Sequence, residues 1–129
     1  MTDHKRPRPT ESELEILQIL WANGPSSVRF VNEQLNQKRE VGYTTTLKLM
    51  QIMADKGLAS RNTDNRSHIY EANAEEGETR KRLLDEFVDA TFQGSAMKLV
   101  VQALGGGQAS REELDEIKAL IRKLESGEK

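Results

Sequence analysis

Three threonines and a lysine, Thr44, Thr45, Thr46 and Lys48, lie close together and are the residues best suited to form a binding surface. Threonine is β-branched and unfavourable in a helix interior, so a run of threonines is expected where a helix begins. There the side chains either cap free backbone N–H groups or contact DNA. In a major groove the hydroxyls would meet phosphates and base edges, the methyls would meet thymine, and Lys48 would follow one turn later. Capping is the commoner role, and both interpretations stay open here.

The chain has no credible set of residues for catalysis or metal binding. Its two histidines are His4 and His68, and it has no cysteine, which excludes disulfide bonds and thiolate metal sites. The run Gly105-Gly106-Gly107 neither follows a strand nor precedes a G-K-[ST] sequence, so it is not a phosphate-binding loop. We therefore predict that the protein is not an enzyme and that it uses no cofactor and no metal.

The charge balance favours a DNA contact in the first part of the chain. The 129 residues carry a net charge of −2, so there is no global basic character. Residues 1–74 hold 10 basic and 9 acidic residues, whereas residues 75–129 hold 9 and 12. The chain has no apolar run of membrane-spanning length and its first residues lack the apolar core of a signal peptide, so we expect a cytoplasmic protein.

Three helices and a hairpin are predicted around the threonine run. A capping box at Thr10 begins the first helix and Gly24-Pro25 ends it; Ser26 or Ser27 caps the second, over residues 28–37. The third lies within residues 41–58 and stops at Gly57. Period-two patterns then predict two strands, joined by a polar turn, over residues 58–63 and 68–72. This order of elements predicts a winged helix-turn-helix domain, in a fold that is mainly α with a small β-hairpin.

The predicted hairpin carries three further candidate DNA contacts, Arg61, Arg66 and His68. An arginine near the tip of a β-ribbon is well placed for phosphate or for a narrow minor groove, although most exposed arginines are only solvated. A histidine in a strand more often packs its ring than acts as a switch. We predict that these three residues support the contacts made by the threonine run.

The remaining residues are helical and amphipathic. Helices are expected over residues 75–93 and 96–104, and a second capping box at Ser110 begins a last helix. About 55 residues of thin helix cannot bury their apolar faces alone, so a second copy is the economical partner and a twofold dimer is predicted. The expected dimer contacts are Phe87, Phe92, Leu114, Ile117, Ile121 and Leu124. We thus expect a flexible basic arm (1–9), a DNA-binding domain (10–74) and a helical dimerisation domain (75–129).

Five segments together resemble a known family. They are T-E-S-E-L-E-I-L-Q-I-L-W-A-N-G-P (10–25), Y-T-T-T-L-K-L-M (43–50), K-G-L (56–58), R-S-H-I-Y-E-A (66–72) and F-Q-G-S (92–95). Their order and spacing are similar to those of the penicillinase repressor family, the BlaI/MecI/CopY type, over nearly the whole chain. The resemblance implies a dimeric winged-helix repressor that binds an inverted-repeat operator in its own or a neighbouring promoter. It also implies, as a possible partner, a membrane-bound sensor protease encoded nearby.

The chain departs from that family at three points. Thr46 and Lys48 stand where the drug-resistance members have an apolar residue and threonine, so operator preference need not carry over. The Asn-Phe bond cut during induction in those members falls on Gln102-Ala103. The cysteine pairs of the copper-responsive members are missing, which argues against copper sensing through thiolates. If release is proteolytic, we expect cleavage between Gln102 and Gln108, because a glycine-rich joint is more accessible than a helix.

A second hypothesis from a different class stays open. A winged helix can serve as a protein-binding adaptor without sequence-specific DNA binding. Specific, salt-sensitive binding to the protein's own upstream DNA would favour the repressor, and its absence at low salt would favour the adaptor.

Overall fold

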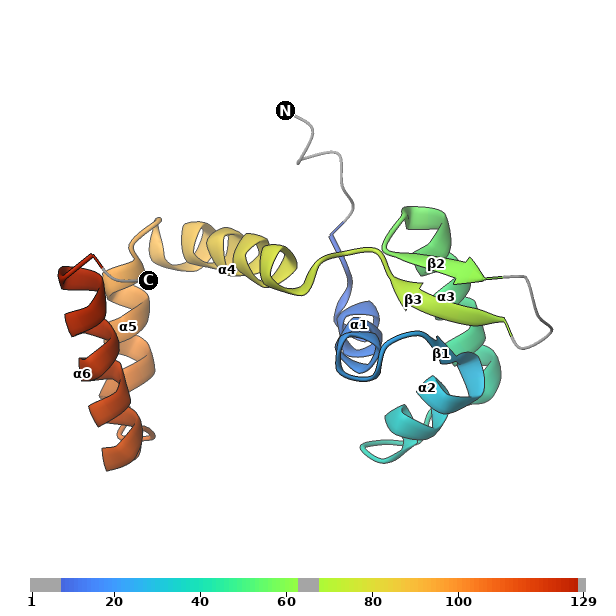
Figure 1. Cartoon of the computed structure of the whole chain (residues 1–129), viewed down its shortest axis with the longest axis horizontal. Coiled ribbons are helices and arrows are strands. Elements are labelled where there is room, and N and C mark those ends of the chain that lie inside the picture. The colour runs from blue at the N-terminus through green and yellow to red at the C-terminus, as the bar shows by residue number, and fades with distance from the viewer. Residues whose placement is uncertain (1–7, 63–67, 128–129) are drawn as a thin grey trace. The chain divides into compact units, whose positions relative to one another are not determined.

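The structure of the protein, a computed structural model, describes residues 8–62 and 68–127 (Figure 1). Arg66, His4 and most of the predicted N-terminal arm lie outside the described residues. The chain divides into two compact units, Met1–Leu83 and Leu84–Lys129. The division falls within the helix α4 (Glu76–Phe92), later in the chain than the boundary expected between residues 74 and 75.

Two helices of the first unit begin at side-chain caps that the sequence predicts. Before α1 (Glu11–Asn23), the Thr10 hydroxyl accepts a hydrogen bond from Glu13 N at 3.2 Å, and the Glu13 carboxylate accepts one from Thr10 N at 2.9 Å. This reciprocal pair is the predicted capping box, which satisfies two N–H groups that a helix start leaves free. Before α2 (Val28–Asn36), the Ser27 hydroxyl accepts from Phe30 N at 3.1 Å. Both predicted helix starts are confirmed.

The third helix, α3 (Tyr43–Lys56), begins in a different way. Its N-cap residue is Gly42, and no side chain in the described part of the chain caps it. The threonine run lies inside the first turn instead, so the interpretation that the threonines cap the helix is wrong. The helix ends as predicted at Gly57, whose φ of 84° lies in the left-handed region that glycine adopts without a Cβ clash.

Three short strands form one antiparallel sheet. The strands β2 (Ala59–Asn62) and β3 (Ile69–Ala72) pair as the predicted hairpin, and β1 (Ser26–Ser27) pairs with the other edge of β3. The sequence does not predict β1, because two serines carry no alternating apolar pattern. Figure 1 shows the hairpin beside α3, which gives the arrangement of a winged helix.

All three helices and the sheet contribute to the core of the first unit. Trp21 is half-buried against this core. Its indole Nε1 donates a hydrogen bond to Ala74 O at 2.9 Å, and the Arg80 guanidinium lies 5.8 Å from the centroid of its ring. The largest fully buried side chains are Tyr70, Ile16, Leu17, Met50, Met53, Val31 and Thr46.

A buried ion pair joins the beginning of α1 to the end of α3. Lys56 Nζ lies 2.7 Å from Glu13 Oε1, and the Glu13 side chain is almost wholly buried. Burial acts to raise the pKa of the Glu13 carboxyl, but the hydrogen bonds from Lys56 and Thr10 outweigh it and hold the pKa below its ordinary value. The pair therefore stabilises the folded state as long as the carboxyl is ionised.

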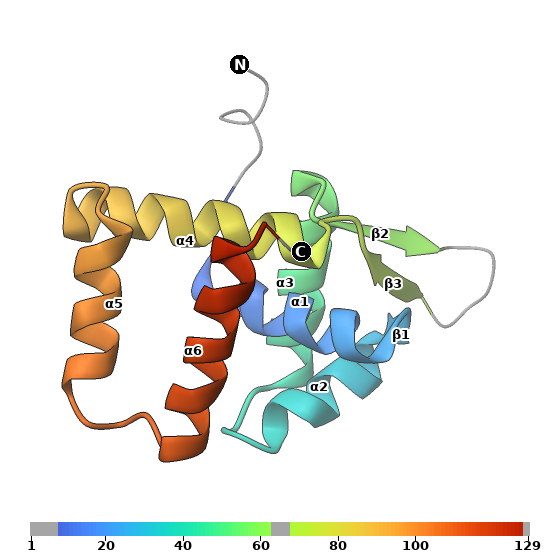
Figure 2. The ribbon, with the colours of Figure 1, turned by 60° about the vertical axis from the view of Figure 1, so that its left-hand side comes forward.

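The second unit contains the end of α4 and the helices α5 (Ala96–Gly105) and α6 (Arg111–Glu125). The predicted break after α4 is confirmed, because Gln93 and Gly94 have φ values of 51° and 80°. Ser95 caps α5, and the predicted capping box at Ser110 caps α6. Figure 2 shows α5 and α6 running in opposite directions on either side of the loop that joins them.

Candidate nucleic-acid interface

The outer face of α3 brings three of the predicted contacts together. Thr44, Thr45 and Lys48 are all exposed within the first two turns of the helix. Gln51 is exposed one turn further on, and Asp55 is exposed near the end of the helix. This face thus changes from neutral and basic at the N-terminal end to acidic at the C-terminal end. An anionic ligand is therefore favoured at the N-terminal half of α3.

Thr46, in contrast, cannot be part of that surface. Its side chain is fully buried, its hydroxyl accepts a hydrogen bond from Asn32 Nδ2 at 2.9 Å, and the same hydroxyl donates to Gly42 O at 3.4 Å. The prediction that Thr46 contacts DNA is wrong, since a side chain without exposed surface cannot reach a groove. The apolar stripe could have indicated this, because residue 46 precedes Met50 by one helical turn.

An asparagine network holds the turn between α2 and α3. Asn32 Nδ2 also donates to Val41 O at 3.0 Å, and Asn36 Nδ2 donates to the same carbonyl at 2.9 Å. Val41 N in turn donates to Asn36 Oδ1 at 3.1 Å. Neither asparagine could be singled out from the sequence, because the role of both depends on the packing of α2 against α3. Through Thr46 and Val41, the network fixes where the outward face of α3 begins.

A groove runs along the first unit between the start of α2, α3 and the hairpin, and we call it the wing groove. Its volume is about 550 Å³. Two of the predicted hairpin contacts, Arg61 and His68, line it together with residues that the sequence analysis did not select. Its lining residues include Arg29, Tyr43, Leu47, Gln51, Arg61 and His68.

The sheet register explains why Arg61 reaches this groove. Arg61 is paired directly with Tyr70, and directly paired residues of antiparallel strands project from the same face of the sheet. The Tyr70 side chain is buried in the core between sheet and helices, so Arg61 also points to the helix side. It therefore lies between the hairpin and α3 and not at the outer tip of a ribbon. His68 is exposed and has a φ of 52°.

Some described cations of the first unit form ion pairs with carboxylates and others do not. Arg39, Lys56 and Arg80 form ion pairs with carboxylates at 2.6, 2.7 and 2.8 Å. For Arg29 and Arg61, the structure has no ion pair within residues 8–62 and 68–127, and the same holds for Lys48. The cations without a carboxylate partner in these ranges thus include Lys48 on α3 and the two arginines of the wing groove.

The described residues contain no cluster of three or more histidines and carboxylates that could hold a metal ion. None of the helices in the same ranges is long and apolar enough to cross a membrane.

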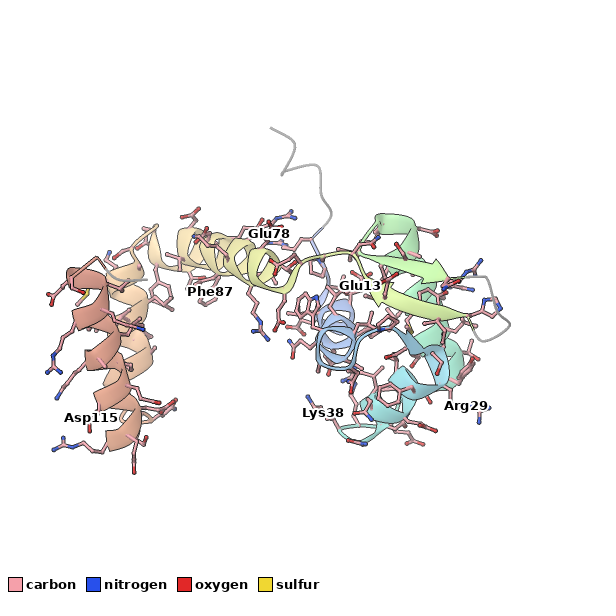
Figure 3. All side chains as sticks on the ribbon, viewed as in Figure 1. Glu13, Arg29, Lys38, Glu78, Phe87 and Asp115 are labelled. Carbon is pink, nitrogen blue, oxygen red and sulfur yellow. The ribbon has the colours of Figure 1, made fainter. Side chains whose placement is uncertain are left out.

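The helices of the second unit expose an unusual amount of apolar surface. Of the predicted dimer contacts, Phe87, Ile121 and Leu124 are 51%, 49% and 66% exposed, and the others are half-buried. Figure 3 shows the Phe87 side chain projecting from α4, and its ring packs edge-on against Phe92 at 5.8 Å between centroids. Exposed residues that the prediction did not include are Leu84, Met97, Val100, Val101 and Leu120.

Comparison with known proteins relates the chain to one group of regulators. A family model described as "Penicillinase repressor" matches residues 9–123. The methicillin resistance regulatory protein MecI of Mammaliicoccus sciuri is 22% identical over 121 residues, covering 94% of this chain and 98% of the relative. The transcriptional regulator BlaI of Mycobacterium tuberculosis is 26% identical over 125 residues, covering 95% and 89%.

A solved structure shares the fold of part of the chain. It is the solution structure of the monomeric form of BlaI from Bacillus licheniformis in complex with the blaP half-operator. It covers 57% of this chain and 89% of that chain, with a TM-score of 0.50 and 19% identity. The likeness agrees with the winged-helix fold predicted from the sequence.

Proposed function

The chain belongs to the penicillinase repressor family, and from this premise we propose that it is a DNA-binding transcriptional repressor. It binds an inverted-repeat operator in its own or a neighbouring promoter, as a homodimer.

The observation that carries the proposal is the outer face of α3. Thr44, Thr45 and Lys48 are exposed at the N-terminal end of the helix, which is the end that contacts base edges in helix-turn-helix proteins. Threonine offers a hydroxyl to phosphate or base edge and a methyl to thymine, and lysine suits phosphate or guanine. Arg61 and His68 support this surface from the hairpin. Arg66 was also predicted to contact DNA, and it lies outside the described residues.

The exposed apolar side chains of the second unit support the dimer. Met97, Val101 and Leu124 are each more than half exposed, which is unfavourable for a monomer in water. A second copy would cover these side chains together with the predicted contacts on α4 and α6. Two linked DNA-binding units bind an inverted repeat much more tightly than either alone, because the second half-site is bound at high effective concentration.

The separation of the DNA-binding unit from the proposed dimerising unit suggests how the protein could be released from DNA. Cleavage of the second unit would separate the two DNA-binding units and remove the gain in effective concentration. Gln102 and Ala103 are exposed but lie within α5, whereas the loop that follows Gly105 is exposed and not helical. We therefore place cleavage between Gln102 and Gln108, by a membrane-bound sensor protease as partner. Mass spectrometry of the chain from induced cells tests this, and an intact chain that has left the operator would rule it out.

DNA binding itself is tested by fluorescence anisotropy with the protein's own upstream DNA and a scrambled duplex of equal length. The expected preference for the specific site is about 10³-fold or more. The double variant Thr44→Ala, Thr45→Ala should lose much of this preference, at about 1–3 kcal/mol per base contact, while its affinity for the scrambled duplex changes little. Both residues are exposed, so folding should be retained, and melting curves check this.

The adaptor hypothesis makes the opposite prediction. A winged helix used only for protein binding would show the same weak affinity for both duplexes, and the double variant would not change it. That result at low salt would refute the proposal that the protein is a repressor.

A further inference from the structure

The wing groove has a composition that differs from the neighbouring surface. Its lining residues include two arginines, Arg29 from α2 and Arg61 from β2, together with His68, and none of the described residues that line it is acidic. The groove between α1 and α2 is lined by Glu15 as well as Lys38, and the hollow at the end of α3 is lined by Asp55 as well as Arg61. The wing groove is therefore the one of these three whose charge suits an anion.

The two arginines have no carboxylate partner among the described residues. In the described ranges neither forms an ion pair, whereas Arg39 and Arg80 of the same unit do. Figure 3 shows Arg29 at the surface of the first unit. Guanidinium groups bind phosphate oxygens through paired N–H donors, and two of them can hold one phosphate from two sides.

The floor of the groove is apolar, and this favours a nucleotide over a small inorganic anion. Leu47 and the half-exposed ring of Tyr43 line it beside the arginines. A free phosphate ion gains nothing from such a floor, whereas the deoxyribose of a DNA strand offers an apolar surface that would cover it. Leu47 immediately precedes Lys48 in α3, so a strand lying in the groove would continue along the proposed base-reading face.

We propose that the wing groove is a binding site for one phosphodiester of the DNA backbone, held by Arg29 and Arg61 with its deoxyribose against Tyr43 and Leu47. This assignment rests on the proposed function. It adds a contact from α2, which the sequence analysis did not include, and it gives Arg61 a defined ligand. The site fixes the position of the duplex relative to α3 but reads no base itself.

The first test measures the salt dependence of operator affinity for the full chain. Because both arginines are needed to hold the one phosphate, Arg29→Ala, Arg61→Ala and the double variant should each flatten the slope of log affinity against log salt by the same amount, about 0.9. This is about a threefold smaller loss of affinity between 50 and 200 mM salt. The affinities for the specific and the scrambled duplex should fall by the same factor. Arg80→Ala is the matched control, since Arg80 is also an exposed arginine but is paired with Glu76, and its slope should equal that of the wild type.

The second test identifies the phosphate. A set of operator duplexes, each with one neutral methylphosphonate in place of a phosphate, is bound to the wild type and to both variants. At one position the methylphosphonate should lower the operator affinity of the wild type but not lower that of Arg29→Ala any further. At the same position it should also leave the affinity of Arg61→Ala unchanged. Different positions for the two arginines would overturn the shared site.

The outcomes separate this inference from the proposed function. If the wild type binds its operator specifically and Arg29→Ala keeps the wild-type salt slope, the proposed phosphate site is refuted, whereas the proposed repressor function is not. If the wild type shows no preference for its own upstream DNA, both fail. Melting curves for both variants show whether folding is retained, and at these exposed positions a change within about 0.5 kcal/mol is expected.

Discussion

Replacing Thr46 with valine should loosen α3 without touching its outer face. The substitution keeps the shape of the side chain but removes a hydroxyl that accepts from Asn32 Nδ2 at 2.9 Å and donates to Gly42 O at 3.4 Å. A neutral hydrogen bond contributes about 0.5–1.5 kcal/mol net, and an unsatisfied buried donor costs about 1–3 kcal/mol. Asn32 is half-buried, so water relieves part of that cost. We expect the free energy of unfolding to fall by about 1–3 kcal/mol.

Urea unfolding followed by the fluorescence of Trp21, the single tryptophan, measures this change in the first unit. Operator affinity should also fall, while affinity for a scrambled duplex stays near the wild-type value, because only the base-reading geometry depends on the start of α3. Thr46→Ser is the control: it keeps the hydroxyl, loses one methyl worth about 0.8 kcal/mol, and should retain operator preference.

Two results would refute this reasoning. If Thr46→Val is as stable as the wild type and binds the operator equally well, the hydrogen bond to Asn32 does not position α3. If Thr46→Ser loses operator preference as severely as Thr46→Val, the packing of the methyl group matters and the hydroxyl does not. A double-mutant cycle with Asn32→Ala should give a coupling of about 0.5–3 kcal/mol if the two side chains act together.

Three further predictions concern the stability and assembly of the chain. Because the pKa of Glu13 is held below the ordinary 4.5, its ion pair with Lys56 should stabilise the fold fully above that pH and lose its effect as pH falls through the lowered pKa; Lys56→Met should flatten this acid-dependent loss in unfolding experiments. The Tyr70 hydroxyl is buried without a hydrogen-bond partner in the described structure, so Tyr70→Phe should leave stability unchanged or raise it by up to about 1–3 kcal/mol; a clear loss in urea unfolding would reveal a partner. Phe92→Ala should shift the chain towards monomer in analytical ultracentrifugation and weaken operator binding, and a wild type that is monomeric at micromolar concentration would remove the proposed dimer.

Elements defined by local chemistry were predictable from the sequence. The capping boxes at Thr10 and Ser110 lie within four residues each, and the stop at Gly57 depends on the conformation of a single residue. The helix starts and ends follow from these motifs without knowledge of the tertiary structure.

Features that depend on packing or register were not predictable in the same way. Thr46 looks like Thr44 and Thr45 in the sequence, and only the packing of α2 against α3 separates the buried residue from the exposed ones. The direction of Arg61 depends on its pairing with Tyr70 across the hairpin. The part played by α2 in the candidate DNA surface, through Arg29, was missed for the same reason.

The separation of the two sides of α3 has a consequence for how such a regulator can diversify. The inner side is fixed by the core and by the Asn32 network, whereas Thr44, Thr45 and Lys48 face solvent and contribute little to folding. Exposed substitutions usually change stability by no more than about 0.5 kcal/mol. Substitutions at these three positions can therefore change the preferred DNA sequence while the stability of the fold stays nearly the same. The same freedom makes them the natural positions to randomise when repressors that do not cross-react are wanted in one cell.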